Sequence, residues 1–161
     1  MGRAKKFNSL LLIFILIPLA VGAVSAFLSG NMSLTYMDIR KPAFAPPGIL
    51  FPVVWTILYI LMGISSYLIY KSDHPQKQDA LKIYFVQLFF NFMWSIIFFG
   101  FSNYLAAFWW LVILILFILY MIYLFYGINR VAAYLQLPYL LWCVFAAVLN
   151  FFIYQMNLGV L

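Results

Sequence analysis

The chain contains the sequence RKPAFAPPGILFPVVW at residues 40–55, with four of its seven prolines. Each proline fixes its own φ and disfavours helix at the preceding residue, so we expect residues 41–47 to form a semi-rigid extended segment. Pro47 suits the first turn of a helix, which would carry Trp55 further into the fold. Pro52 lies either in the frayed start of that helix or at a kink in it. A plain connector between two helices would use its prolines in the same way.

The composition around this stretch is that of an integral membrane protein. Of 161 residues, 68% are hydrophobic, 22% are aromatic and only 7% are charged. A soluble domain needs a charged surface, whereas long apolar runs separated by short polar ones are expected where lipid is the solvent. The single cysteine, Cys143, excludes an intramolecular disulfide and a thiol-based metal cluster.

Five apolar runs predict an all-α fold, a bundle of five transmembrane helices forming one domain over residues 1–161. The predicted spans are roughly 7–28, 47–70, 80–101, 104–126 and 131–156. The first run is longer than a signal-peptide core and four spans follow it, so we expect it to be an uncleaved helix. Within it, Gly22, Ala26 and Gly30 recur every four residues. This spacing permits close approach of another helix, although a lipid-facing stripe would have the same pattern.

The distribution of basic residues predicts the orientation. Arg40 and Lys41 lie on the side of the first loop. The other seven lie on the side of the amino terminus: Arg3, Lys5, Lys6, Lys71, Lys77, Lys82 and Arg130. The positive-inside rule therefore predicts a multi-pass protein of the cell membrane with a cytoplasmic amino terminus and an external first loop. The net charge of +6 reflects this topology, and we expect no nucleic-acid partner.

The interiors of the predicted spans carry no Asp, Glu, Lys, Arg or His. Proton-coupled carriers place ionisable groups near the bilayer midplane, so this mechanism is not expected. Paired carboxylates, nucleophile triads, phosphate-binding loops and metal-ligand spacings are also missing, which argues against hydrolysis and phosphoryl transfer. We expect neither a metal nor a resident cofactor.

Three predicted spans instead carry polar and aromatic residues at helical spacing. The stripes are Trp55, Tyr59, Met62 and Ser66 in the second span, Gln87, Asn91 and Ser95 beside Trp94 in the third, and Trp142, Ala146 and Asn150 in the fifth. The amides could be hydrogen-bonding contacts between helices, with the aromatic rings as ordinary packing. Alternatively, the stripes line a pocket with aromatic walls, orienting polar groups and Ala146 as a small floor.

Three ordered segments resemble the TspO/MBR family of tryptophan-rich sensory proteins and mitochondrial translocator protein, the peripheral-type benzodiazepine receptor. They are KPAFAPPGILFPVVWTILYILMG at 41–63, QLFFNFMWS with FFG at 87–100, and LPYLLW with FA and LN at 137–150. The resemblance implies a five-helix bundle with a pocket under the first extramembrane loop. It also implies binding of porphyrins and haem-related tetrapyrroles, of isoquinoline-type drug ligands and, in animal members, of cholesterol.

The resemblance also assigns roles to individual residues. Trp55 and Trp142 would form the indole walls, with Tyr36 and the loop at residues 42–47 as a lid. Gln87 and Asn91 would orient a polar group of the ligand. The complete set of expected ligand-binding residues is Tyr36, Pro42, Phe44, Pro47, Trp55, Tyr59, Gln87, Phe90, Asn91, Trp94, Trp142, Phe145, Ala146 and Asn150.

Two departures from the family pattern affect these expectations. Phe44 and Ile49 stand where many members have tryptophan, so the lid is less rich in indoles. The sterol-type pattern at residues 149–152 has no Lys or Arg after it, which argues against a sterol role.

We rank three functions. The first is a tetrapyrrole-binding sensor or scavenger, in which the ligand stacks between indoles and its propionates meet Arg40 and Lys41. The second is an enzyme for light- or oxygen-dependent porphyrin breakdown, with Trp55 and Trp142 as oxidisable catalytic groups. The third is a transporter of porphyrins or other lipophilic ligands, which the odd helix number and the missing inverted repeat disfavour. A homodimer remains open.

Overall fold

The computed structural model describes residues 2–158, with side chains from Ser9 onward, and this part of the chain is helical without strands. The elements are α1 (Gly2–Leu28), α2 (Met32–Asp38), α3 (Leu50–Lys71), α4 (Lys77–Ser95), the π-helical turn η1 (Ile96–Gly100), α5 (Tyr104–Ile128), α6 (Arg130–Tyr134) and α7 (Leu137–Met156). Within residues 2–158, five helical segments are long and apolar enough to cross a membrane. The predicted all-α, five-span fold is therefore confirmed.

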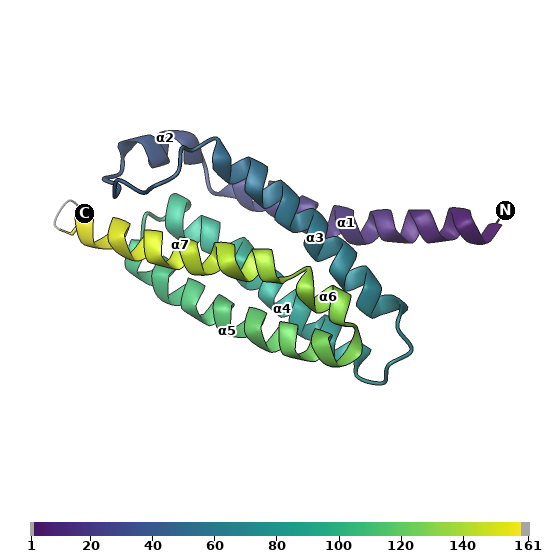
Figure 1. The fold of residues 1–161 in the computed structure, drawn as a ribbon. Helices are drawn as coiled ribbons and strands as arrows, with labels where there is room; N and C mark the ends of the chain where they lie inside the picture. Colours follow the sequence, from purple (N-terminus) through teal and green to yellow (C-terminus); the bar gives the residue numbers. More distant parts are fainter. Residues whose placement is uncertain (1, 159–161) are drawn as a thin grey trace.

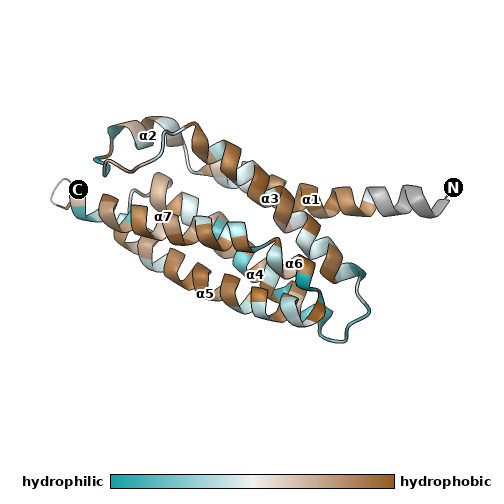
Figure 2. Cartoon of the chain, viewed as in Figure 1, coloured by the Kyte–Doolittle hydropathy of each residue, from teal (hydrophilic) through white to brown (hydrophobic). Residues whose placement is uncertain are grey.

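The long helices form a bundle in which α1 packs on α3, while α5 packs on both α4 and α7 (Figure 1). The segment with α2 lies at the same end of the bundle as the end of α7, and we call this the loop end. The opposite end holds α6 and the loop between α3 and α4. Polar residues gather in the connecting segments and apolar residues along the helices (Figure 2), as expected where lipid surrounds the bundle.

Two glycines permit the close crossing of α1 and α3. A Cβ atom on Gly63 would lie 2.5 Å from the Cα of Ile15, and one on Gly22 would lie 2.2 Å from Cε2 of Tyr59. The predicted small-residue stripe is thus confirmed at Gly22. It is wrong at Gly30, which lies beyond the end of α1 with a positive φ of 76° and has open space around it. That conformation suits glycine, so Gly30 serves the turn out of α1.

The second span begins later than predicted, because residues 47–49 form a turn and α3 starts at Leu50. The Leu50 N–H donates to the carbonyl of Pro47 at 2.9 Å. Pro52 then falls within the first turn of α3, where a backbone N–H would have no partner inside the helix. Of the two alternatives for Pro52, the position in the first turn is therefore confirmed.

The fifth span is interrupted, contrary to the continuous helix predicted at 131–156. α6 ends at Tyr134 and α7 begins at Leu137, with Pro138 in its first turn. A proline ring clashes with the carbonyl four residues earlier, which here belongs to Tyr134, and it offers no N–H. The helix therefore stops at Tyr134 and restarts, and the two pieces together make the span.

Two further helical features are absent from the sequence prediction. α2 lies in the first loop, and the Oδ1 of Asn31 caps it by accepting the N–H of Leu34 at 3.2 Å. The third span ends in η1, where the N–H of Phe101 donates to the carbonyl of Ile96 at 2.9 Å. The wide turn re-aims the aromatic side chains near the end of α4, and such turns are frequent at functional sites.

Candidate ligand pocket

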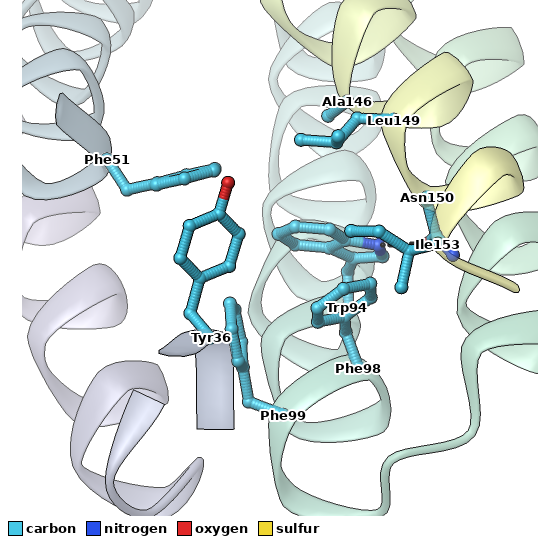
Figure 3. Close-up of a pocket in the computed structure, with 9 residues that line it drawn as sticks. All are labelled: Tyr36, Phe51, Trp94, Phe98, Phe99, Ala146, Leu149, Asn150 and Ile153. Carbon is cyan, nitrogen blue, oxygen red and sulfur yellow. Dashed lines mark hydrogen bonds between the residues drawn. The ribbon is translucent and has the colours of Figure 1, made fainter. Parts of the chain in front are cut away.

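A pocket lies at the loop end, between α2 and the start of α3 on one side and α4, η1 and α7 on the other (Figure 3). Nine residues line it: Tyr36, Phe51, Trp94, Phe98, Phe99, Ala146, Leu149, Asn150 and Ile153. The space open to the centre of a water-sized sphere is about 10 Å³, enough for about one water molecule. Pockets for drug-sized ligands enclose about 300–1,000 Å³, so a tetrapyrrole requires the walls to separate.

Four of the predicted site residues line this pocket, namely Tyr36, Trp94, Ala146 and Asn150. The Trp94 indole N–H donates to Oδ1 of Asn150 at 3.3 Å, and Nδ2 of Asn150 donates to the carbonyl of Tyr104 at 2.8 Å. This pair of bonds joins α4 to α7 and to the start of α5. The indole of Trp94 is thereby fixed as a rigid wall.

A chain of side-chain hydrogen bonds joins α3, α4 and α7 deeper in the bundle. The Tyr59 hydroxyl donates to Oδ1 of Asn91 at 2.7 Å, and Nδ2 of Asn91 donates to the Tyr139 hydroxyl at 3.2 Å. Tyr139 in turn donates to Oε1 of Gln87 at 2.8 Å. All four side chains are buried, and protein partners replace the lost water at every polar atom of this chain except Nε2 of Gln87, which has no partner among the described residues. Of the two alternatives for these amides, interhelical bonding is the one seen here.

Trp55 lies against this hydrogen-bonded chain. Its ring stacks on Tyr59 with centroids 5.4 Å apart and planes inclined by 29°. It also lies 6.5 Å from the Trp94 ring and 6.1 Å from the Tyr139 ring. Offset aromatic contacts at these separations are favourable. We call Trp55, Tyr59, Trp94 and Tyr139 the indole cluster, and its Trp94 ring reaches the pocket.

Trp142 belongs to a separate aromatic group nearer the loop end. Its ring lies 5.8 Å from Phe51 and 5.5 Å from Phe145. Among the described residues no ring contact joins Trp142 to Trp55, so the two predicted walls do not face each other directly in this conformation. The indole nitrogen of Trp142 is buried without a hydrogen-bond partner in the described part of the chain, and a polar ligand atom could use it.

The loop over the pocket is held by Tyr36. Its hydroxyl donates to the carbonyl of Pro46 at 2.8 Å, and its ring lies 5.1 Å from Phe51. Burial raises the pKa of the Tyr36 phenol above its usual value, so the hydroxyl remains a donor at neutral pH. These contacts hold Tyr36 against the loop at Pro46, and the lid role of Tyr36 and the 42–47 loop stays a prediction.

The remaining lid residues lie close by. Phe44 packs edge-on against Phe145 and Phe152, with centroids 6.4 and 5.4 Å apart. The carbonyls of Pro42 and Pro47 accept the N–H groups of Ala45 and Leu50 at 3.0 and 2.9 Å. Pro42 and Pro47 therefore begin two consecutive turns, and neither lines the pocket. The segment at residues 41–47 contains a turn and is less extended than predicted.

Phe90, another predicted site residue that does not line the pocket, packs on the neighbouring helix α5. Its ring stacks on Trp110 of α5 with centroids 4.5 Å apart, and the Trp110 indole donates to the Phe90 carbonyl at 2.8 Å. Successive residues of a helix point about 100° apart, whereas positions four and seven apart share a face. Gln87, Asn91 and Trp94 therefore face the bundle interior while Phe90 faces α5.

Five lining residues were missing from the predicted set: Phe51, Phe98, Phe99, Leu149 and Ile153. Helical spacing would have found all five. Phe51 lies one turn before Trp55, and Leu149 and Ile153 continue the stripe from Ala146. Phe98 and Phe99 lie one turn after Trp94 and Ser95, within the π-helical turn η1.

The fold and the pocket define a five-span helical membrane protein with an aromatic site under a proline-rich loop. The sequence model of the TspO/MBR family matches residues 14–156, and the chain belongs to this family. Tryptophan-rich protein TspO of Archaeoglobus fulgidus is 39% identical over 144 residues, covering 89% of this chain and 94% of the relative. Tryptophan-rich sensory protein of Cereibacter sphaeroides is 32% identical over 76% of both chains. Translocator protein of Homo sapiens is 33% identical, covering 84% of this chain and 82% of the relative.

Proposed function

We propose that this protein is a membrane receptor for tetrapyrroles such as protoporphyrin, acting as a sensor or scavenger. The observation that carries the proposal is the indole cluster, which presents the Trp94 ring to a pocket otherwise lined mainly by apolar side chains. A flat aromatic ligand gains stacking energy from such walls in addition to apolar burial. Relatives carry the names tryptophan-rich sensory protein and translocator protein, which agrees with a role in binding and signalling at a membrane.

Binding requires the pocket to open, and the contacts favour opening on one side. The wall formed by Trp94 and Asn150 is fixed by side-chain hydrogen bonds. The opposite wall is held by the Tyr36 hydroxyl bond, by the bonds between Asn157 and the Arg40 backbone, and by ring contacts of Phe51. Separating two rings leaves no polar group unpaired, whereas breaking a buried hydrogen bond leaves unsatisfied groups that cost about 1–3 kcal/mol each. Movement of α2 and the lid loop would therefore expose the indole cluster.

Light- or oxygen-dependent breakdown of the bound porphyrin is an extension of the same proposal. Indole is more easily oxidised than phenylalanine, and Trp55 stacks on Tyr59 and lies near Trp94. A photoexcited porphyrin in the opened pocket would therefore have oxidisable neighbours and need no acid or base. Isoquinoline-type ligands would use the same aromatic walls.

Titration of purified protein with protoporphyrin IX in the dark tests the binding. The expected result is quenched tryptophan fluorescence together with a shifted Soret band. Each single change Trp55→Phe and Trp142→Phe should weaken binding modestly, because stacking contributes about 0.5–1.5 kcal/mol. Trp109→Phe is the matched control, because Trp109 is 59% exposed on α5 and should leave the affinity unchanged. Wild-type protein that gives no saturable signal would contradict the proposal.

Illumination of the same complexes tests the enzymatic extension. If the indoles donate electrons, Trp55→Phe should remove most of the accelerated pigment loss while retaining most of the dark binding. Binding and degradation that fall in the same proportion would mean that the indoles act only as walls. Degradation that is unchanged in both variants would exclude them as electron donors.

We also propose that the lid faces the outside of the cell. The support is the distribution of basic residues, because only two of the nine Lys and Arg residues lie on the lid side of the membrane. Cysteines introduced at Ala43 and Ser72, in a Cys143→Ala background, can be labelled in intact cells with a membrane-impermeant thiol reagent. The Ala43 position should react and the Ser72 position should not. The reverse pattern would place the pocket mouth in the cytoplasm.

A further inference from the structure

Asn157, the residue that follows α7, forms hydrogen bonds with the backbone of the first loop. Asn157 is only 7% exposed. Its Oδ1 accepts the N–H of Arg40 at 3.2 Å, while its Nδ2 donates to the carbonyl of Arg40 at 2.9 Å and to that of Ile153 at 2.7 Å. One amide thus satisfies both backbone groups of Arg40, and it ties them to a residue that lines the pocket. The backbone of Arg40 is thereby anchored to the end of α7 that contributes Ile153 to the pocket.

The two basic residues of this loop have different roles. The Lys41 ammonium donates to the carbonyls of Tyr36, Met37 and Ile39, and it lies 4.8 Å from the Tyr36 ring centroid. A cation at these carbonyls stabilises the end of α2. The Lys41 ammonium is therefore already hydrogen-bonded within the first loop and is not free to bind a ligand.

Arg40 has an exposed side chain on a fixed backbone. The one ion pair that the structure shows among residues 9–158 joins Lys82 to Asp79, so the guanidinium of Arg40 is not paired with the nearby Asp38. Guanidinium offers a planar set of donors that matches a carboxylate in a two-bond geometry. A clamped backbone reduces the freedom that Arg40 must lose when it forms such bonds.

We propose that Asn157 positions Arg40 as the carboxylate-recognising residue of the pocket, so that the protein selects ligands with an aromatic body and an anionic end. This inference rests on the proposed tetrapyrrole binding. It assigns charge recognition to Arg40 and assigns Lys41 to the stability of the lid. Ligand selectivity should therefore depend on Arg40 far more than on its neighbour.

Protoporphyrin IX and its dimethyl ester form a suitable pair of probes, because they share the macrocycle and differ in the carboxylates. Titrations in the same detergent, followed by tryptophan quenching, should show the free acid binding roughly tenfold more tightly than the ester. Arg40→Gln should reduce this preference to within about twofold by weakening the acid alone. Lys41→Gln, the matched control, should retain most of the preference. A preference that disappears in Lys41→Gln and survives in Arg40→Gln would overturn the assignment.

Asn157→Leu tests the positioning role. Amide hydrogen exchange at Arg40 should accelerate, while exchange within α4 and α5 stays unchanged and shows that the bundle is folded. The preference for the free acid should fall although Arg40 is still present. Unchanged exchange at Arg40, or an unchanged preference, would overturn the role of Asn157. Equal affinity of wild-type protein for acid and ester would overturn the inference alone, whereas binding of neither probe would overturn the proposed function with it.

Discussion

The crossing of α1 and α3 offers a sharp test of the packing, through the substitution Gly63→Ala. A Cβ atom at Gly63 would lie 2.5 Å from the Cα of Ile15 and 2.7 Å from the carbonyl oxygen of Phe14. Ordinary carbon contacts lie at about 3.5–4.0 Å, so the helices must separate by roughly 1 Å. The atoms met are backbone atoms, and a rotamer change cannot relieve the clash.

The expected change in the free energy of unfolding combines a loss of packing between α1 and α3 with a gain in helix propensity. A radial gap of about 0.5–1 Å forfeits roughly a quarter to a half of each contact's attraction along the interface. Inserting a methyl group into a packed interior typically costs about 1–3 kcal/mol. Alanine is favoured over glycine within a helix by about 0.8–1.0 kcal/mol, which offsets part of that cost. We therefore expect Gly63→Ala to lower the free energy of unfolding by about 0–2 kcal/mol relative to wild type, and by about 1–3 kcal/mol relative to a helical Gly→Ala change that meets no clash.

Thermal unfolding in detergent, followed by tryptophan fluorescence, measures the effect. Gly127→Ala is the matched control, because Gly127 also lies in a helix and a Cβ there meets nothing within 4 Å. The control should be as stable as wild type or slightly more stable. A Gly63→Ala protein that melts together with the control would show that α1 and α3 cross less tightly than the structure indicates.

Three further substitutions test individual polar groups by the same melting assay. Asn91→Leu should destabilise the protein by about 2–5 kcal/mol, because Tyr59 and Tyr139 each lose a buried partner; stability within 1 kcal/mol of wild type would contradict the hydrogen-bonded chain. Gln136→Leu should retain or raise the stability, because both polar atoms of this buried amide lack a partner among the described residues; a loss as large as that of Asn91→Leu would reveal partners. Ser25→Ala should cost about 0.5–1.5 kcal/mol, because its hydroxyl donates at 2.6 Å to a carbonyl of α4; an unchanged melting temperature would mean that this contact between α1 and α4 is dispensable.

The number and order of the spans could be predicted because lipid leaves few alternatives. A backbone in hydrocarbon must satisfy its own hydrogen bonds, so each apolar run of sufficient length becomes a helix. The short α2 escaped prediction because it lies outside any apolar run and its main signal is the cap residue Asn31. The break before α7 was readable in principle, since Pro138 forbids an intact helix through Tyr134.

The pocket was only partly predictable from helical spacing. Spacing correctly grouped Gln87, Asn91 and Trp94 on one face, and it indicated Ala146 and Asn150 on another. It could not show that Trp55 and Trp142 fall in separate aromatic groups, because that depends on how α3 and α7 are placed relative to each other. That placement is a tertiary property, which a pattern within one helix does not encode.

The hydrogen bonds are distributed so that the inner part of the site is rigid while its mouth can open at a lower cost in free energy. Below the pocket, buried bonds link α3, α4 and α7 through the indole cluster and Asn91. Opening this part would leave several buried polar groups without partners, each at a cost of about 1–3 kcal/mol. Around the mouth, the contacts are ring edges, the Tyr36 hydroxyl and the Asn157 clamp, where a released polar group can bond to water. Opening is therefore least costly at the lid, on the side of the pocket opposite the fixed Trp94 ring.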